Sequence, residues 1–449
     1  MDEPDKAETP NGADGGSTLT VGAADEVDPA ITDQQLTAVS PEVLATTTGE
    51  YFRAWGQRIR NGESGALPII VGLIIIVVFF QIEEPKFLTA GNLVNLLEQS
   101  STYVMFGAAA MFALILSEID LSIGYTAGVG AFVIAELIAA PVNLPWWLGI
   151  IGGLAACGVI GFVQGTLVTR LNLPSFIVTL AGYLGLLGVM LELAQIDKTA
   201  VGGVISIDQN SPVYKLVQNN MSTTLGWLVL IVTLVLFTAF TLLGRRRRQA
   251  QGLSTPPLGV TLLMLGASAV GGVVLLLICN ANRGNGIAFL GGTPWVVPFV
   301  AVVLVFYTWL LTKTRLGRYM YAIGANPEAA RRAGINVSRI KTTAFVMCSI
   351  TAGIAGLIYA SNQGSMATDI NGGALVLYGV AAAVIGGTSL FGGRGKPLHA
   401  LLGGIVIAVV FNGLGLMGIS SAGTDIATAV VLLAAVTLDS LVRRRSTIR

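Results

Sequence analysis

Long apolar runs recur along this chain, and they constrain its fold more than any other feature. A helix of about 20 apolar residues crosses about 30 Å of hydrocarbon, and lipid admits only helices and closed barrels because each backbone polar group must be satisfied internally. The runs lie at residues 67–82, 101–117, 122–140, 145–169, 173–196, 224–243, 258–279, 294–312, 342–360, 374–391, 398–418 and 423–441. The sequence therefore predicts an all-α fold, a polytopic transmembrane helical bundle of about 12 helices, within a range of about 10 to 14. The second and third runs are short, and they could form a broken or re-entrant unit.

Composition agrees with a membrane protein. Only 11% of the 449 residues are charged, against about 25% in a soluble domain, and the chain contains 56 glycines. The three cysteines, Cys157, Cys279 and Cys348, lie in apolar segments without C-x-x-C spacing. We therefore expect small core residues rather than a disulfide framework or a metal site.

The first 50 residues differ from the rest. They hold 11 of the 25 acidic residues and a single basic residue, Lys6. No apolar stretch follows a basic start, so the segment does not resemble a secretory signal. We predict a disordered acidic cytoplasmic tail over 1–50, a cytoplasmic juxtamembrane segment over 51–66, a transmembrane domain over 67–441 and a basic cytoplasmic tail over 442–449.

Lysine and arginine set the orientation, because cytoplasmic loops carry an excess of them. With the N-terminus in the cytoplasm, 21 of the 25 lysines and arginines beyond residue 50 fall on the cytoplasmic side. Four fall outside, namely Lys86, Lys198, Lys215 and Arg283. The run Arg245–Arg248 directly follows an apolar span and indicates a stop-transfer signal rather than a nucleic-acid patch. Both termini are therefore predicted to be cytoplasmic, in a multi-pass protein of the cytoplasmic membrane.

The sequence lacks the common nucleotide-binding, metal-binding and catalytic motifs. No G-x-x-x-x-G-K-[ST] loop occurs, since Gly395-Lys396 is followed by Pro397 without the upstream glycine. The lone histidine, His399, makes neither a metal site nor a triad, and neither G-x-S-x-G nor H-E-x-x-H occurs. We expect no catalytic residues, no metal and no cofactor on this chain.

The polar segment 313–341 is too long for a plain connector. Asn326-Pro327 is a good helix start, Glu328 would lie in the first turn, and Gly334 would end the helix. Such a short capped helix suits docking into a groove of a partner. A surface helix at the lipid headgroups fits the spacing equally well.

Several motifs resemble those of a known family. Glu328-Ala329-Ala330-x-x-x-Gly334 looks like the EAA loop of ABC importer permeases, although the trailing I-x-L-P is absent. SEIDLSIG (117–124), LPSFIVTLAG (173–182), GRYMYAIGANPEAARRAGINVSRIK (317–341) and VIGGTSLFGG (384–393) resemble the ribose/xylose class of simple-sugar permeases over roughly residues 68–441. The helix pair at 224–279 with its basic turn resembles xylose-type members.

The resemblance implies a transport subunit. Two permease subunits, a homodimer in the simplest case, would form the path, an external sugar-binding protein would deliver the sugar, and separate ATPase subunits would bind ATP and Mg. A coupling loop over 313–341 would contact the ATPase. The coupling residues implied are Asn326, Pro327, Glu328, Ala329, Ala330, Arg331, Arg332 and Gly334.

Polar groups inside spans are costly and tend to face cavities. Candidates for the translocation path are Glu118, Asp120, Gln164, Phe176, Thr179 and Asn412. For Asp120 the favoured alternative is the N-cap of the following helix, and for the other polar residues it is hydrogen bonding between helices. Three rival functions stay open: an ion-coupled secondary transporter, an intramembrane enzyme and a branched-chain amino-acid ABC permease.

Overall fold

The computed structural model describes residues 47–60, 66–196, 202–284, 289–368, 370–430, 433 and 437. The helices are α3 Thr48–Arg60, α4 Leu67–Glu83, α5 Ala90–Leu114, α6 Ile123–Ile138, α7 Trp146–Arg170, α8 Ser175–Ile196, α9 Pro212–Gln218, α10 Thr223–Ala250, α11 Leu258–Asn280, α12 Val296–Lys313, α13 Arg315–Ala325, α14 Pro327–Arg332, α15 Val337–Gln363, α16 Gly372–Ile385 and α17 Pro397–Leu416. Residues 421–430 are also helical. Strands β1 (Val204–Ser206) and β2 (Ser365–Ala367) form one antiparallel pair. The all-α prediction is confirmed.

Seven helices in the described part of the chain are long and apolar enough to cross a membrane. They are α7, α8, α10, α11, α12, α15 and α17, and α4, α6 and α16 are shorter apolar helices. The chain is thus a multi-pass membrane protein. Of the last predicted span, 423–441, the described residues are 423–430, 433 and 437, and the tails 1–46 and 442–449 lie outside the described residues. α3 begins at Thr48, so the helix starts slightly inside the predicted tail.

The largest correction concerns α5. We predicted a span over 101–117, but the helix runs from Ala90 to Leu114. Its first half carries Asn92, Asn95 and Glu98, which lower the hydropathy of that stretch. Other polar residues of the helix, Ser100–Thr102, are buried within the protein. Tertiary packing therefore supports the polar half of the helix, and the unit is an unbroken helix followed by a linker.

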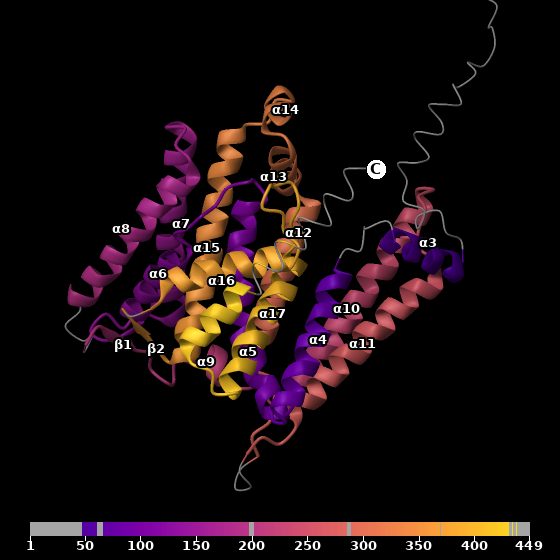
Figure 1. The fold of residues 1–449 in the computed structure, drawn as a ribbon, viewed down its shortest axis with the longest axis horizontal. Helices are drawn as coiled ribbons and strands as arrows, with labels where there is room; N and C mark the ends of the chain where they lie inside the picture. The colour runs from indigo at the N-terminus through magenta and orange to yellow at the C-terminus, as the bar shows by residue number, and fades with distance from the viewer. Residues whose placement is uncertain are drawn as a thin grey trace, which may run out of the picture.

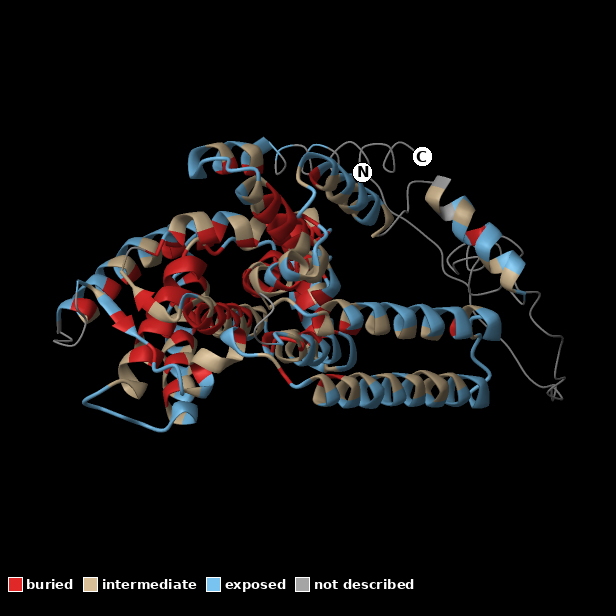
Figure 2. Cartoon of the chain, turned by 90° about the horizontal axis from the view of Figure 1, so that it is seen from below, coloured by how far each residue is buried: buried red, intermediate tan, exposed pale blue. Residues whose placement is uncertain are grey.

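The helices divide into a well-buried body and an exposed flank (Figure 1). In the body, α15 packs along α5, α6 and α7, while α17 and α16 pack on α5. α4, α10 and α11 stand to one side, and Figure 2 shows burial concentrated in the body and exposed residues along α10 and α11. The connecting helices α13 and α14 lie at the upper end of Figure 1, whereas β1, β2 and α9 lie at the lower end.

Close packing in the body depends on glycines at helix contacts. A Cβ at Gly403 of α17 would lie under 3.0 Å from the carbonyl oxygen of Ala382 on α16, whereas a Cβ at Gly415 would meet nothing within 4 Å. We expect Gly403→Ala to destabilise the protein by about 1–3 kcal/mol or more, because helix backbones must separate. Gly415→Ala is the matched control and should have little effect. Thermal unfolding of the two variants in detergent checks this, and equal melting temperatures would contradict it.

Candidate functional site

α14 is a short helix whose ends are fixed by local capping, as the sequence predicts. The Asn326 side chain accepts the Ala329 N–H at 2.9 Å, and Pro327 occupies the first turn. At the other end Gly334 has φ +81°, in the left-handed region that favours glycine, and its N–H donates to the Arg331 carbonyl at 3.0 Å. These bonds hold the helix in shape without help from distant residues.

Most of α14 faces outward. Ala330 is buried, whereas Glu328, Ala329, Arg331 and Arg332 are exposed. The Glu328 carboxylate lies 3.3 Å from Arg331 and 3.6 Å from Arg332, and its side chain is 58% exposed. Exposed pairs of this kind contribute only about 0–1 kcal/mol each. The charged groups therefore contribute little to the fold and remain available to a partner.

α13 holds α14 against the body. A Cβ at Gly324 would clash with the Ile115 carbonyl oxygen and the Gly393 N–H, so only glycine permits this approach. The Tyr321 hydroxyl donates to the Gly395 carbonyl at 2.5 Å, and burial raises the pKa of Tyr321, which keeps it a donor. α14 therefore projects from a fixed base formed by α13 and the α16–α17 loop.

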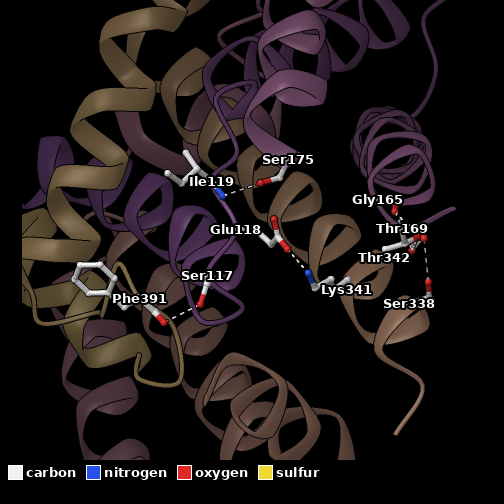
Figure 3. Close-up of polar contacts among 10 residues, drawn as sticks. All are labelled: Ser117, Glu118, Ile119, Gly165, Thr169, Ser175, Ser338, Lys341, Thr342 and Phe391. Atoms are coloured by element: carbon white, nitrogen blue, oxygen red, sulfur yellow. Dashed lines mark hydrogen bonds and ion pairs between the residues drawn. The ribbon is translucent and has the colours of Figure 1, made fainter. Parts of the chain in front are cut away.

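The α5–α6 linker, defined here as residues 115–122, touches several elements at this end of the body (Figure 3). Ser117 donates to the Phe391 carbonyl of the α16–α17 loop at 2.8 Å. The Ile119 N–H lies 3.4 Å from the hydroxyl of Ser175, at the start of α8. Glu118 forms an ion pair with Lys341 of α15. The linker is thus held at once by α8, α15 and the α16–α17 loop.

Asp120, near the end of the linker, is 2% exposed and belongs to a buried polar network. Its Oδ1 accepts the N–H of Ser122 at 2.8 Å and the hydroxyl of Ser122 at 2.6 Å. The amide of Gln164 on α7 donates to the Ser122 hydroxyl at 2.9 Å, and the Cys348 thiol of α15 lies 3.5 Å from Asp120 Oδ2. Asp120 lies two residues before the N-cap, Ser122, so it holds an Asx-type turn rather than the N-cap position considered for it.

The other path candidates lie in three places. Thr179 is buried on α8 and donates to the Ser175 carbonyl at 2.9 Å, with the Ile119 carbonyl at 3.3 Å, so it adjoins the linker. Phe176 on the same helix is 52% exposed. The side-chain amides of Asn412 and of Asn92 on α5 form two hydrogen bonds with each other, at 2.7 and 3.0 Å. The structure therefore brings together Glu118, Asp120, Gln164 and Thr179, while Phe176 faces outward and Asn412 joins a separate contact.

A pocket of about 340 Å³ lies between the C-terminal end of α7 and the α14–α15 turn. Its lining includes Thr169, Asn172, Arg331, Asn336 and Lys341, so it contains two cations and no acid. Among the described residues, no group of three His, Cys, Asp or Glu side chains lies close enough to bind a metal. This end of the body therefore offers a cationic recess beside an exposed helix.

Sequence reasoning missed three partners in these contacts: Ser175, Lys341 and Asn92. They lie far from their partners along the chain, so a single sequence contains no local signal for them. Ser122 is close to Asp120 in the sequence, and the Asp-x-Ser spacing of 120–122 favours the Asx turn that the two residues form.

Known proteins resemble this chain along most of its length. The family model "Branched-chain amino acid transport system / permease component" matches residues 92–438. The xylose transport system permease protein of Escherichia coli strain K12 is 32% identical over 382 residues, covering 84% of this chain and 92% of that protein. The ribose import permease protein of the same strain is 29% identical, covering 83% and 92%. The D-allose transport system permease protein of that strain is 26% identical, covering 83% and 90%.

These relatives confirm the resemblance to the ribose/xylose class that the sequence motifs indicated. No solved structure matches the chain. Because the family model covers well over half of the residues, and a relative above 30% identity is matched over most of both chains, the chain belongs to the family of branched-chain amino acid transport system permease components.

Proposed function

We propose that this chain is the transmembrane permease subunit of an ATP-binding-cassette importer that moves a monosaccharide, such as xylose, inward across the cytoplasmic membrane. The observation that carries the proposal is α14, an exposed and locally capped helix that contains the EAA-like residues Glu328–Ala330. The similarity to permeases named for xylose, ribose and allose, over 83–84% of this chain, supports a simple sugar as cargo.

The proposed orientation places α14 in the cytoplasm with both termini. α3 lies at the same end of the molecule as α14 (Figure 1), and the exposed Arg246–Arg248 at the C-terminal end of α10 would lie there too. β1, β2 and α9, at the opposite end, would then face the external sugar-binding protein. The further partners are an ABC ATPase subunit, a second permease subunit in a homodimer, and the lipid bilayer.

Transport would proceed by alternating access. Closure of two ATPase subunits around ATP and Mg²⁺ would displace α14, and the helices of the body would change between outward and inward access. This chain itself would hold no cofactor and make no covalent bond. We assign Glu118, Asp120, Gln164 and Thr179 to one region that lines or gates the path, and Phe176 and Asn412 to separate parts of the path.

The proposal is tested by purifying the chain with the products of its neighbouring genes and assaying ATP hydrolysis in lipid nanodiscs. Xylose, ribose, allose and leucine are supplied in turn, each with the external binding protein. We expect a stable ATPase partner and stimulation by one of the sugars. Stimulation by leucine alone would show that the chain serves amino-acid import, the function named in the description of the family model. Ion-driven uptake without any ATPase partner would overturn the proposal.

A further inference from the structure

Two acids of the α5–α6 linker bind one face of α15. Glu118 forms an ion pair with Lys341, and the Cys348 thiol donates to the carboxylate of Asp120. Lys341 and Cys348 are seven residues apart on a helix, a spacing that places both on the same face, two turns apart. The linker therefore lies along α15, and residues 118 to 120 follow any displacement of that face.

The Glu118–Lys341 pair differs from the charged pairs of α14 in its burial. The side chains of Glu118 and Lys341 are only 12% and 24% exposed, whereas those of Glu328, Arg331 and Arg332 are 58 to 81% exposed. Loss of one member of a sheltered pair leaves a charge without a counter-charge where water is scarce. The contact is therefore a firm connection between linker and helix.

Lys341 also belongs to the surface beside α14. It lines the same pocket as Arg331, the fifth residue of that helix. Between the helices the turn is short and hydrogen-bonded: the Ile335 N–H donates to the Ala330 carbonyl at 3.1 Å, and the Asn336 side chain accepts the Arg339 N–H at 3.0 Å. A displacement of α14 therefore reaches the first turns of α15 directly.

On its far side the linker leads into the buried polar network. Ile119 contacts α8 through Ser175, and Asp120 holds Ser122, which contacts Gln164 of α7. Moving the linker relative to α7 and α8 must change these contacts, because a close-packed interior has no slack to absorb the movement.

Resting on the proposed function, we propose that the Glu118–Lys341 ion pair is the positioning contact that transmits displacement of α14 to the α5–α6 linker and the buried network. Neither residue contacts the ATPase subunit in this scheme. The pair makes uptake depend on ATP hydrolysis, and it is not required for the ATPase subunit to bind.

The test uses the full complex with four variants: Glu118→Lys, Lys341→Glu, the double exchange of both, and Lys341→Met, which keeps length without charge. Copurified ATPase subunit, ATP hydrolysis and sugar uptake are measured in proteoliposomes. We expect each single variant to retain the ATPase subunit while uptake per ATP hydrolysed falls about fivefold or more, and the double exchange to recover most of that loss. If charge reversal prevents insertion, Lys341→Met and Glu118→Gln give the same comparison.

Two results would overturn the inference. Uptake per ATP unchanged in the single variants would show that the pair transmits nothing. Loss of the bound ATPase subunit, or a double exchange as impaired as the singles, would assign the pair to docking or to folding instead. A wild-type chain that neither binds an ATPase subunit nor supports sugar uptake would overturn the proposed function itself, and this inference with it.

Discussion

Glu328→Lys should abolish ATP-coupled sugar uptake while the amount of inserted protein stays unchanged. Among the described residues, Glu328 forms ion pairs with Arg331 and Arg332, and these two exposed pairs contribute about 0–1 kcal/mol each to folding. Stability therefore changes little. At the proposed interface, the new lysine would add a like charge beside two arginines. Like-charge juxtaposition costs several kcal/mol at an interface, and each 1.4 kcal/mol is a tenfold loss of affinity.

Two matched variants separate the interface from the helix. Glu328→Gln removes the charge but keeps the side-chain length in the first turn of α14, so its effect should be smaller. Gln249→Lys places a new positive charge on the exposed C-terminal end of α10, away from α14, and should leave uptake intact. Copurification of the ATPase subunit and uptake into proteoliposomes are the measurements. Normal binding and normal uptake by Glu328→Lys would remove α14 from the docking interface.

The sequence predicts α14 well because every determinant of this helix is local. Asn326, Pro327 and Gly334 act on backbone groups within a few residues, and each takes the expected role. Most apolar spans were likewise recognised within a few residues, since a run of about 20 apolar residues is itself the signal.

The start of α5 and the contacts of the linker depend instead on residues distant in the sequence. In the polar first half of α5, Val94, Leu96 and Ser100–Thr102 are buried within the protein, and this packing supports the helix there. Lys341 pairs with a residue 223 positions away, and Asn412 with one 320 positions away. From the sequence alone Lys341 counted only as one of many cytoplasmic cations. Its pairing with Glu118 depends on how distant helices pack, and no local pattern in the sequence indicates that packing.

Asp120→Ala is expected to unfold the upper end of the body and to eliminate uptake. Asp120 Oδ1 is the acceptor for both the N–H and the hydroxyl of Ser122, at 2.8 and 2.6 Å, in a site where Asp120 is 2% exposed. Alanine leaves these donors without that acceptor, and each buried unsatisfied group costs about 1–3 kcal/mol. We expect a lower melting temperature and less inserted protein.

Asp208→Ala is the matched control for the loss of this turn. Asp208 accepts the N–H of Asn210 at 3.0 Å with the same two-residue spacing, but at an exposed position. Water can replace its carboxylate, so its removal should hardly change the melting temperature. A similar loss of stability in both variants would show that the turn, rather than the buried network, sets the cost.

Asp120→Asn then separates hydrogen bonding from charge. Asparagine keeps an acceptor oxygen for Ser122, so the network that contacts Gln164 and Cys348 should survive and the melting temperature should remain near that of the wild type. We expect this variant to retain most of its uptake, because the contacts of Asp120 with Ser122 require an acceptor oxygen and no counter-charge. A folded Asp120→Asn protein without uptake would contradict that expectation and show that transport needs the negative charge itself.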